Sequence, residues 1–276
     1  MKPRLFIFGL GYTAARVASE VSAMGWEVIA TGRAGALDFD DKGSVRVALD
    51  AATHILSSVP PVADGDPVLN LYGDALRGRW MGYLSSTGVY GDCGGAWVDE
   101  RAPLKGRRAN RNEADLAWQK LGARVFRLPG IYGPGRSMLD RVSAGAAHRI
   151  DLADQVFSRI HVDDIVSGVV AGFDAPAGVY NLSDDLPTSQ NHVVEHACAL
   201  LGLPLPPLQS LDEANLSPAA CAFYAENRRV ANGKAKRVLG WKPRYPTYVE
   251  GLGALKAMNA PTIASAAPPA ASVVQR

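Results

Sequence analysis

The sequence predicts an α/β protein built around a parallel sheet, because short apolar runs alternate with segments of helical spacing along its first half. The predicted strands cover residues 5–8, 26–31, 53–59, 80–86 and 124–128, and the predicted helices cover residues 12–24, 66–77 and 109–121. Continuous apolar runs such as Leu5–Phe8 are typical of strands that are buried on both faces. We therefore expect helices on both sides of the sheet.

The second half of the chain is less regular. Residues 163–173 and 188–201 have helical spacing, 179–182 form a predicted strand, and the proline-rich segment 203–207 is a predicted loop. From about residue 259, alanine, proline and serine dominate, and such a segment buries too little apolar surface to offset chain entropy. We expect a first domain over residues 1–178 with some interleaved segments of the second, a small C-terminal α/β lobe over 179–258, and a disordered tail over 259–276.

Composition and charge set broad limits on function. The 276 residues are 47% hydrophobic and 20% charged, with a formal net charge of +2, and no long basic stripe argues for nucleic acid. Three distant cysteines, Cys93, Cys198 and Cys221, suggest neither a disulfide framework nor a metal knuckle, so we expect a reducing, cytoplasmic location. The apolar run near the N-terminus is too short for a signal peptide, and none is long enough to span a membrane.

The first strand is followed by a glycine-rich turn, Gly9-Leu10-Gly11-Tyr12-Thr13-Ala14, which fits the pattern G-x-G-x-x-A. The first glycine permits a tight bend, the second lets the backbone approach a pyrophosphate, and the small third residue lets helix and strand pack closely. The amides and dipole of the following helix favour phosphates. Because the turn follows a strand and opens a helix, we expect a dinucleotide site in a Rossmann-type, doubly wound parallel sheet.

The end of the second strand indicates which dinucleotide is bound. Arg33 lies 19 residues after Ala14, where NAD-specific folds place an acidic residue for the ribose hydroxyls. A guanidinium there suits the 2′-phosphate of NADP, through bidentate charge-assisted bonds. We therefore expect NADP(H), with NAD as the alternative if Arg33 is only a solvated surface residue.

Several segments, in the same order along the chain, resemble the extended short-chain dehydrogenase/reductases, the NAD-dependent epimerase/dehydratase family. They are Ser85–Asp92 (SSTGVYGD), Arg127–Gly135 (RLPGIYGPG), Arg159–Asp164 (RIHVDD), Val179–Leu182 (VYNL) and Leu239–Pro243 (LGWKP). The resemblance extends to about residue 256. It implies a Rossmann domain with a small C-terminal substrate lobe, and a homodimer is also an expectation of the resemblance.

The resemblance also implies further cofactor contacts beyond the glycine turn. They are Ser58, Val59 and Pro60 after one strand, Phe39 and Asp40 at the end of a short third strand near the adenine, and Pro129, Gly130 and Ile131 beside the nicotinamide. Ser86 falls at the position of the active-site serine or threonine of the family, four residues before Tyr90.

Two departures from the family pattern affect the expected chemistry. The glycine turn is not the usual G-x-x-G-x-x-G, and Arg107 and Arg111 stand where the family carries its Tyr-x-x-x-Lys pair. In the family the tyrosine is the general acid/base. An arginine does not release its proton near neutral pH, so Arg111 is expected to bind ribose or phosphate instead. The chain thus resembles atypical members that lack the pair.

Other side chains must then supply the catalytic groups. Tyr90 or Tyr132 is a candidate replacement for the acid/base, and the hydroxyl of Ser86 or Thr87 is a candidate for orienting a carbonyl. The alternative for both tyrosines is packing in the core with a satisfied hydroxyl.

Three other patterns have plainer interpretations. His192, Glu195 and His196 match the zinc pattern H-x-x-E-H, but no third ligand has supporting spacing, so we expect no metal site. His161 is expected to anchor a turn, with Asp163–Asp164 capping the next helix. The basic cluster Lys105–Arg111 is either a solvated face or a surface that attracts an anionic substrate such as a sugar nucleotide.

The sequence therefore leaves two main hypotheses, and a third, weaker one of a reaction on a bound nucleotide-like ligand without hydride transfer. The first is an NAD(P)-dependent oxidoreductase or epimerase that acts on a small carbonyl compound or a nucleotide-linked sugar. The second is an NADP(H)-binding sensor or scaffold protein without catalysis, since the nucleotide turn is present while the Tyr and Lys positions are lost. None of these hypotheses involves nucleic acid or a membrane.

Overall fold

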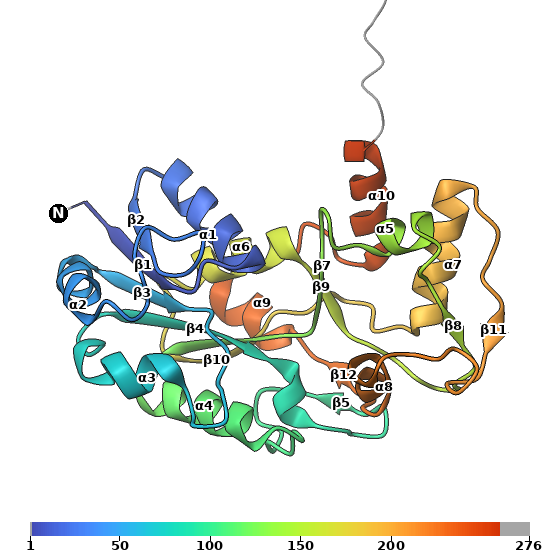
Figure 1. Ribbon diagram of the computed structural model, residues 1–276, viewed down its shortest axis with the longest axis horizontal. Helices are drawn as coiled ribbons and strands as arrows, with labels where there is room; N and C mark the ends of the chain where they lie inside the picture. The colour runs from blue at the N-terminus through green and yellow to red at the C-terminus, as the bar shows by residue number, and fades with distance from the viewer. Residues whose placement is uncertain (1, 260–276) are drawn as a thin grey trace, which may run out of the picture.

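The protein, described here by a computed structural model of residues 2–259, is organised around a six-stranded parallel sheet (Figure 1). The strand order is β10-β6-β4-β3-β1-β2, and every neighbouring pair is parallel. The strands are β1 (Arg4–Phe8), β2 (Glu27–Ala30), β3 (His54–Ser57), β4 (Trp80–Ser86), β6 (Arg124–Leu128) and β10 (Gly178–Asn181). The predicted doubly wound α/β fold is confirmed.

Helices cover both faces of this sheet because the strands are apolar on both sides. One face packs against α1 (Tyr12–Ala23), α6 (Val162–Ala171) and α9 (Gly233–Leu239). The other packs against α2 (Lys42–Ala51), α3 (Pro67–Tyr72) and α4 (Ala109–Lys120). Alternate residues of one strand serve the two cores: in β1, Leu5 and Ile7 face one, and Phe6 and Phe8 face the other.

A smaller part of the molecule lies beyond the carboxyl ends of the strands, at the right of Figure 1. Its core joins α5 (Met138–Ser143), α7 (Gln190–Leu201) and α10 (Tyr248–Asn259). Three two-stranded sheets and a short helix lie outside the main sheet among the described residues. These elements are β5 (Trp97–Val98) with β12 (Arg229–Val230), β7 (Gly130–Tyr132) with β9 (Arg159–His161), β8 (Arg149–Ile150) with β11 (Leu208–Gln209), and α8 (Pro218–Tyr224). One of these sheets, β8 with β11, is at the far right of Figure 1 beside α7.

The chain passes between the two parts more than once. Strand β10 follows the boundary proposed at residue 178 yet pairs with β6 in the main sheet, whereas α5 precedes that boundary and packs against α7. We retain the division as a proposal with interleaved segments on both sides. Helix α10 ends at Asn259, and the remainder of the predicted disordered tail lies outside the described residues.

The short third strand expected to end at Phe39–Asp40 is absent. Only a single bridge, between Thr31 and Leu37, follows β2. The chain turns back too sharply to run beside β2: Gly32 has φ +114°, and a Cβ on Gly35 would lie 2.4 Å from the Ala30 carbonyl oxygen. The expected third strand was therefore wrong, and β2 is the edge of the sheet.

Helix α2 was not predicted from the sequence. Its amphipathic signal is short, since only Val45 and Leu49 are buried on it. The side chain of Asp41 caps its N-terminus by accepting a hydrogen bond from the Ser44 amide at 3.1 Å.

A buried ion pair ties the centre of the sheet to α4. The Arg127 guanidinium donates to both carboxylate oxygens of Asp115, at 2.7 and 3.1 Å, and Ser85 Oγ donates to the same carboxylate at 2.6 Å. Arg127 also donates to the Tyr90 hydroxyl, which donates to Asn181 Oδ1. The two charged side chains are 2% and 0% exposed, so the pair depends on these additional hydrogen bonds.

Replacement of Asp115 by alanine should therefore destabilise the protein strongly. It leaves the Arg127 guanidinium buried without a counter-charge, a change that costs about 3–5 kcal/mol in the free energy of unfolding. Urea unfolding followed by circular dichroism measures the loss. The matched control is Asp99→Ala, which breaks the exposed Asp99–Arg101 pair and should change little. Similar losses in the two variants would contradict the assignment.

Candidate functional site

The glycine turn lies where the strand order reverses. The chain runs from β1 outward to β2, then returns to β3 on the other side of β1, and ligands of open parallel sheets bind in the crevice at such a point. Gly9 has φ +81°, and a Cβ there would lie 3.0 Å from Val59 Cγ2. The Ser58 hydroxyl donates to the Gly9 carbonyl oxygen. Ser58 and Val59 therefore lie against the turn, and Pro60 is exposed beside them.

The start of α1 fits a pyrophosphate. Gly11 precedes the helix, no side chain caps the first turn, and a Cβ at Gly11 would meet nothing within 4 Å. Backbone amides of an uncapped first turn are free to bind phosphate oxygens. Ala14 is buried against the sheet, as the small third position of the motif requires, and Thr13 is buried beside it.

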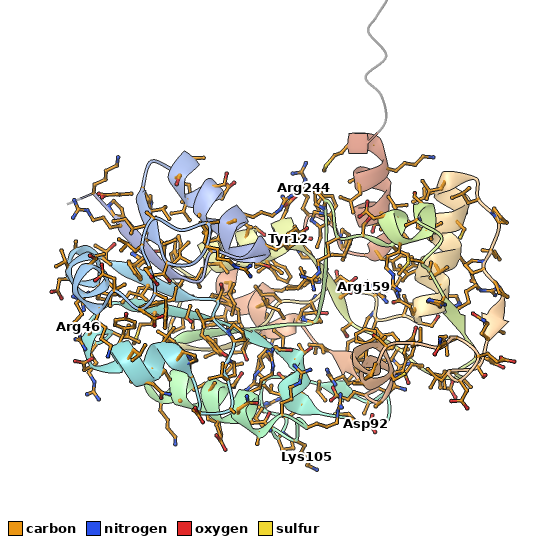
Figure 2. All side chains as sticks on the ribbon, in the orientation of Figure 1. Tyr12, Arg46, Asp92, Lys105, Arg159 and Arg244 are labelled. Atoms are coloured by element: carbon orange, nitrogen blue, oxygen red, sulfur yellow. The ribbon has the colours of Figure 1, made fainter. Side chains whose placement is uncertain are left out.

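Tyr12, labelled in Figure 2, joins the glycine turn to the segment after β7. Its hydroxyl donates to the Pro134 carbonyl oxygen at 3.1 Å, and burial raises the pKa of Tyr12, while the positive charges of Arg16 and Arg136 oppose the shift. The ring lies between these two guanidinium groups, with Arg16 Cζ 5.7 Å and Arg136 Cζ 5.8 Å from its centre.

The residues predicted for the adenosine end lie in the loop after β2. Arg33 is exposed, and within residues 2–259 it forms no ion pair. Phe39 is half-buried against the rings of Phe8 and Tyr72, and Asp40 is exposed. The guanidinium of Arg33 is thus available to an anionic ligand.

Two adjoining cavities lie beyond β4 and β6. The smaller, of about 290 Å³, is lined by Ser86 and Thr87, by Pro129, and by the arginines of α4 and its preceding loop. The larger, of about 460 Å³, extends from Ile131 and Tyr132 towards α7 and α10. Both are lined by Gly130, Phe157, Ser158 and Phe223, so they share a wall.

The four predicted catalytic hydroxyls separate into three environments. Ser86 and Thr87 line the smaller cavity, and Tyr132 lines the larger. Tyr90 lines neither. It is fully buried, and its hydroxyl is occupied by Arg127 and Asn181. The structure thus gives Tyr90 the packing role weighed from the sequence, and we no longer propose it as an acid/base.

Ser86 and Tyr132 differ in what their hydroxyls are free to do. Ser86 Oγ accepts a hydrogen bond from the Gly88 amide at 3.1 Å, which leaves its own proton available to a ligand. The Tyr132 hydroxyl has only a long contact, 3.5 Å, to the Thr247 carbonyl oxygen. Burial raises the pKa of Tyr132, so at neutral pH this phenol is protonated and is a donor rather than a base.

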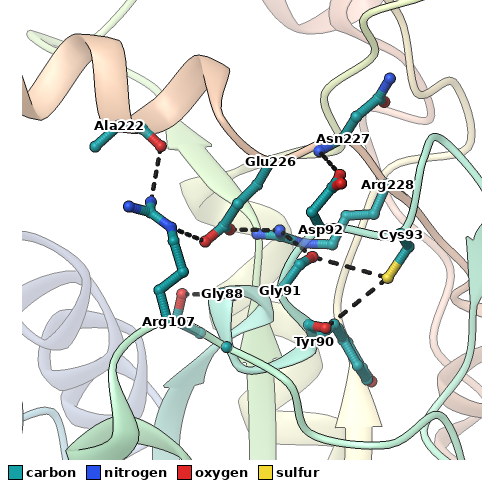
Figure 3. A network of polar contacts seen from close by, with 12 residues as sticks. Gly88, Tyr90, Gly91, Asp92, Cys93, Arg107, Ala222, Glu226, Asn227 and Arg228 are labelled. Carbon is teal, nitrogen blue, oxygen red and sulfur yellow. Dashed lines mark hydrogen bonds and ion pairs between the residues drawn. The ribbon is translucent and has the colours of Figure 1, made fainter.

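Arg107 and Arg111 both line the smaller cavity, but they are bonded differently. Figure 3 shows Arg107 reaching α8 and the segment after it, where Nε donates to Glu226 at 2.7 Å and Nη2 to the Ala222 carbonyl oxygen at 2.8 Å. Arg228 donates to the other oxygen of Glu226 at 2.6 Å. Arg107 therefore holds α8 across the cavity, whereas Arg111 forms no side-chain hydrogen bond or ion pair with the described residues.

The charge balance of this cavity is positive. Arg107, Arg108, Arg111 and Arg228 line it with the single carboxylate of Glu226. Burial acts to raise the pKa of Glu226, but the hydrogen bonds from Arg107 and Arg228 outweigh it, so the pKa lies below its usual value and the group is ionised. Arg107 and Arg108 of the basic cluster are thus exposed and also line this cavity, together with the half-buried Arg111, so both interpretations of the cluster stay open.

Sequence reasoning missed two buried charged residues beside the larger cavity. Arg159 lines it and is 6% exposed, and Asp184 is 1% exposed with neither carboxylate oxygen hydrogen bonded within the described chain. Arg159 stands directly before the IHVDD segment and is thus visible in the sequence, but nothing there shows that it is buried. Asp184 follows a strand in the sequence without any distinguishing spacing.

The histidines and the paired aspartates serve local structure. His161 Nδ1 accepts from the Asp163 amide, as expected for a turn anchor. Asp163 pairs with Arg16 and Asp164 accepts from the Tyr245 amide, so neither caps α6. Glu195 pairs with Arg149, and residues 2–259 hold no cluster of three His, Cys, Asp or Glu side chains suited to a metal. No helix in that range is long and apolar enough to cross a membrane.

Known proteins resemble this chain to different extents. No family model matches it. A 3-diazoavenalumate denitrifying reductase from a Streptomyces species is 32% identical over 150 residues, which cover 50% of this chain and 48% of the reductase. The chain thus spans about half the length of the curated relative it matches.

Solved structures match over almost the entire chain. A conserved protein of unknown function from Silicibacter pomeroyi is 41% identical, with a TM-score of 0.82 over 93% of this chain and 99% of that one. A human epimerase family protein with NADPH is 16% identical, with a TM-score of 0.73, covering 92% and 99%. The dTDP-glucose 4,6-dehydratase of Bacillus anthracis, with NAD, is 16% identical, with a TM-score of 0.72, covering 92% and 96%.

The fold is therefore that of the NAD-dependent epimerases and dehydratases, as the sequence motifs indicated. Within that fold class, this chain and the Silicibacter pomeroyi protein belong to the same family.

The Asp184 carboxyl should make stability depend on pH. Burial raises its pKa to about 8, against the opposing charge of Arg159, while the unfolded chain releases this proton at about pH 4. The folded protein should therefore lose stability as the pH rises from about 4 to about 8, because only the folded state retains the proton in that range. Between about pH 5 and about pH 8, we expect the melting temperature of Asp184→Asn to fall less than that of the wild type.

The control for that measurement is Asp64→Asn, at an exposed carboxylate that is not among the groups acting on Asp184. It should leave the loss of melting temperature between the two pH values as in the wild type. An unchanged pH dependence in Asp184→Asn would show that Asp184 does not carry the effect.

Proposed function

We propose that the protein is an NAD(P)(H)-dependent oxidoreductase or epimerase whose substrate binds in the two adjoining cavities. The observation that carries the proposal is the uncapped glycine turn at the reversal point of the sheet, at the same edge as Ser86, Thr87 and Gly130. The cofactor residues are proposals taken from the sequence and supported by this arrangement. The free cysteines and the chemistry of the fold suit a cytoplasmic location, which is also a proposal.

The nicotinamide cofactor would be held along that edge of the sheet. The first turn of α1 suits the pyrophosphate, Arg33 suits a 2′-phosphate, and Pro129 to Ile131 border the cavities where the ring would lie. When bound, a nicotinamide supplies or accepts a hydride. NADP is favoured over NAD by the single argument that Arg33 is exposed and free of any acidic partner in the described chain.

The side chains of the protein orient the substrate and place protons. Ser86 donates a hydrogen bond from its hydroxyl to a substrate oxygen. The Gly88 amide already donates to Ser86 Oγ, so the hydroxyl proton is free to point towards the substrate. Thr87 presents a second hydroxyl to the same cavity. Arg111 binds an anionic or ribose group where the family carries lysine. The Tyr132 phenol stays protonated, so it donates a hydrogen bond and does not act as a base.

Net reduction is the direction that we favour over epimerisation. The curated relative is named as a reductase, and neither candidate tyrosine offers a tyrosinate base near neutral pH: Tyr90 is buried with its hydroxyl occupied, and burial raises the pKa of Tyr132. The second candidate remains an NADP(H)-binding sensor without turnover. Its support is the bonding of Arg107 to Glu226, at the position where the family carries its acid/base.

The first test is a calorimetric titration of the full chain with NADPH and NADH, repeated on Arg33→Ala. NADPH should bind about tenfold or more tightly than NADH, since a charge-assisted hydrogen bond contributes about 1.5–3 kcal/mol. Arg33→Ala should remove this preference and leave NADH binding unchanged, and Arg101→Ala, at another exposed arginine, should retain it. Failure to bind either nucleotide would refute both the enzyme and the sensor.

The second test separates these two candidates. A panel of carbonyl compounds and nucleotide sugars should yield NADPH oxidation by the wild type, and Ser86→Ala should lower kcat about 10²-fold while nucleotide binding is retained. Tight NADPH binding without turnover of any compound would favour the sensor.

A further inference from the structure

Arg159 is a buried cation without an anionic partner. It projects from β9 into the larger cavity and is 6% exposed, near the middle of the molecule in Figure 2. Its guanidinium lies over the Tyr248 ring, 5.7 Å from the ring centre. Its hydrogen-bond contacts are long and go to neutral oxygens: the Thr188 carbonyl at 3.4 and 3.5 Å, and Gln190 Oε1 at 3.5 Å. Among residues 2–259 it forms no ion pair. A buried charge normally has a counter-charge and short hydrogen bonds, because desolvation is otherwise costly.

Asp184 does not supply that counter-charge. Its two oxygens accept no hydrogen bond, and it forms no ion pair with Arg159 in the described chain. Burial raises its pKa to about 8, so it is mostly protonated at neutral pH. Among the described residues, the guanidinium of Arg159 thus lines a cavity without forming an ion pair.

The remaining walls of the cavity are mainly apolar and aromatic. The side chains of Tyr132, Met138, Val193, Tyr248 and Leu252 form one side, and Phe157 and Phe223 stack face to face with ring centres 4.2 Å apart on the other. Two further arginines line the cavity, but both are exposed: Arg136, and Arg141, which donates to the Ala146 carbonyl oxygen. Arg159 is thus the one buried arginine among the described lining residues.

The cavity also has a defined orientation relative to the proposed reaction. Arg159 is the register partner of Gly130 in the β7–β9 pair, and Gly130 lines both cavities. A molecule anchored on Arg159 would extend along the shared wall towards Ser86 and Thr87. Its far end would then lie where the proposed nicotinamide site begins.

We propose that the larger cavity binds a small aromatic or aliphatic acid whose carboxylate pairs with Arg159, and that this acid is the substrate of the oxidoreductase. The second clause rests on the function proposed above, whereas the binding itself does not. A carboxylate is preferred to a phosphate because Arg159 is the one buried cation among the described lining residues, so it balances a single negative charge, whereas a phosphate dianion would leave a second charge unbalanced beside it.

The test uses 3-phenylpropanoate as probe, with 3-phenylpropanamide as its neutral counterpart and phenyl phosphate as the alternative anion. Calorimetry on the full wild-type chain should show the acid binding at least about tenfold more tightly than the amide and than the phosphate, as expected for a charge-assisted bidentate pair. Arg159→Met should weaken the acid about tenfold or more and leave the amide within about twofold. Arg159→Lys should recover part of the loss, and Arg101→Met, at an exposed arginine that lines neither cavity, should behave as wild type.

Several results would overturn the proposal. They are equal binding of acid and amide by the wild type, tighter binding of phenyl phosphate, undetectable binding of the acid, and acid binding that persists in Arg159→Met. If Arg159→Met does not fold, the proposal is tested by the affinities of the wild type for the acid and for the amide. Titration of the same samples with NADPH separates the two proposals: acid binding without NADPH binding supports the carboxylate site and refutes the oxidoreductase, and the reverse refutes only the carboxylate site.

Discussion

The buried pair between Asp115 and Arg127 is the interaction on which the arrangement of the site depends. It fastens α4 to β6, the added bond from Ser85 fastens it to β4, and the link through Tyr90 extends to β10. Arg111 lies four residues before Asp115, one turn away on the same face of α4, so the anchored aspartate directs Arg111 towards the smaller cavity. The pair also explains why Tyr90 is structural, since its hydroxyl completes the hydrogen bonds of the arginine.

The arginines of this protein show how the role of a guanidinium depends on whether a carboxylate pairs with it. Arg127 has a bidentate carboxylate and serves the core. Arg107 and Arg228 share the carboxylate of Glu226 and hold the segment after α8 over the smaller cavity. Arg159 has neutral, distant neighbours and faces a cavity. The same side chain thus acts as a structural element where its charge is matched and becomes a candidate ligand group where it is not.

The resemblance to solved structures establishes the architecture but not the chemistry. Structures at 16% identity share the fold with this chain over nearly all of its length. In the function proposed above, arginines stand at the positions that the resemblance assigns to the usual catalytic pair, and serine, threonine or tyrosine hydroxyls at the cavities take the proton-carrying role. A fold of this kind supports many reactions, so the identity of the reaction depends on the cavities rather than on the sheet.

The sequence alone determined the fold class, the glycine turn and the positions of the main strands along the chain, because these follow from local periodicity and from backbone conformations that only glycine adopts easily. It did not reveal α2, whose buried face consists of two residues, and it predicted a third strand where the chain turns so closely that a Cβ on Gly35 would lie 2.4 Å from the Ala30 carbonyl oxygen. Only the tertiary structure separated Tyr90 from Ser86 and Tyr132, and only it showed that Arg159 is buried without a counter-charge. The physical reason is that burial and charge compensation depend on residues far apart in the chain, such as Arg127 with Asn181 or Arg107 with Glu226, and local sequence patterns contain no information on such contacts.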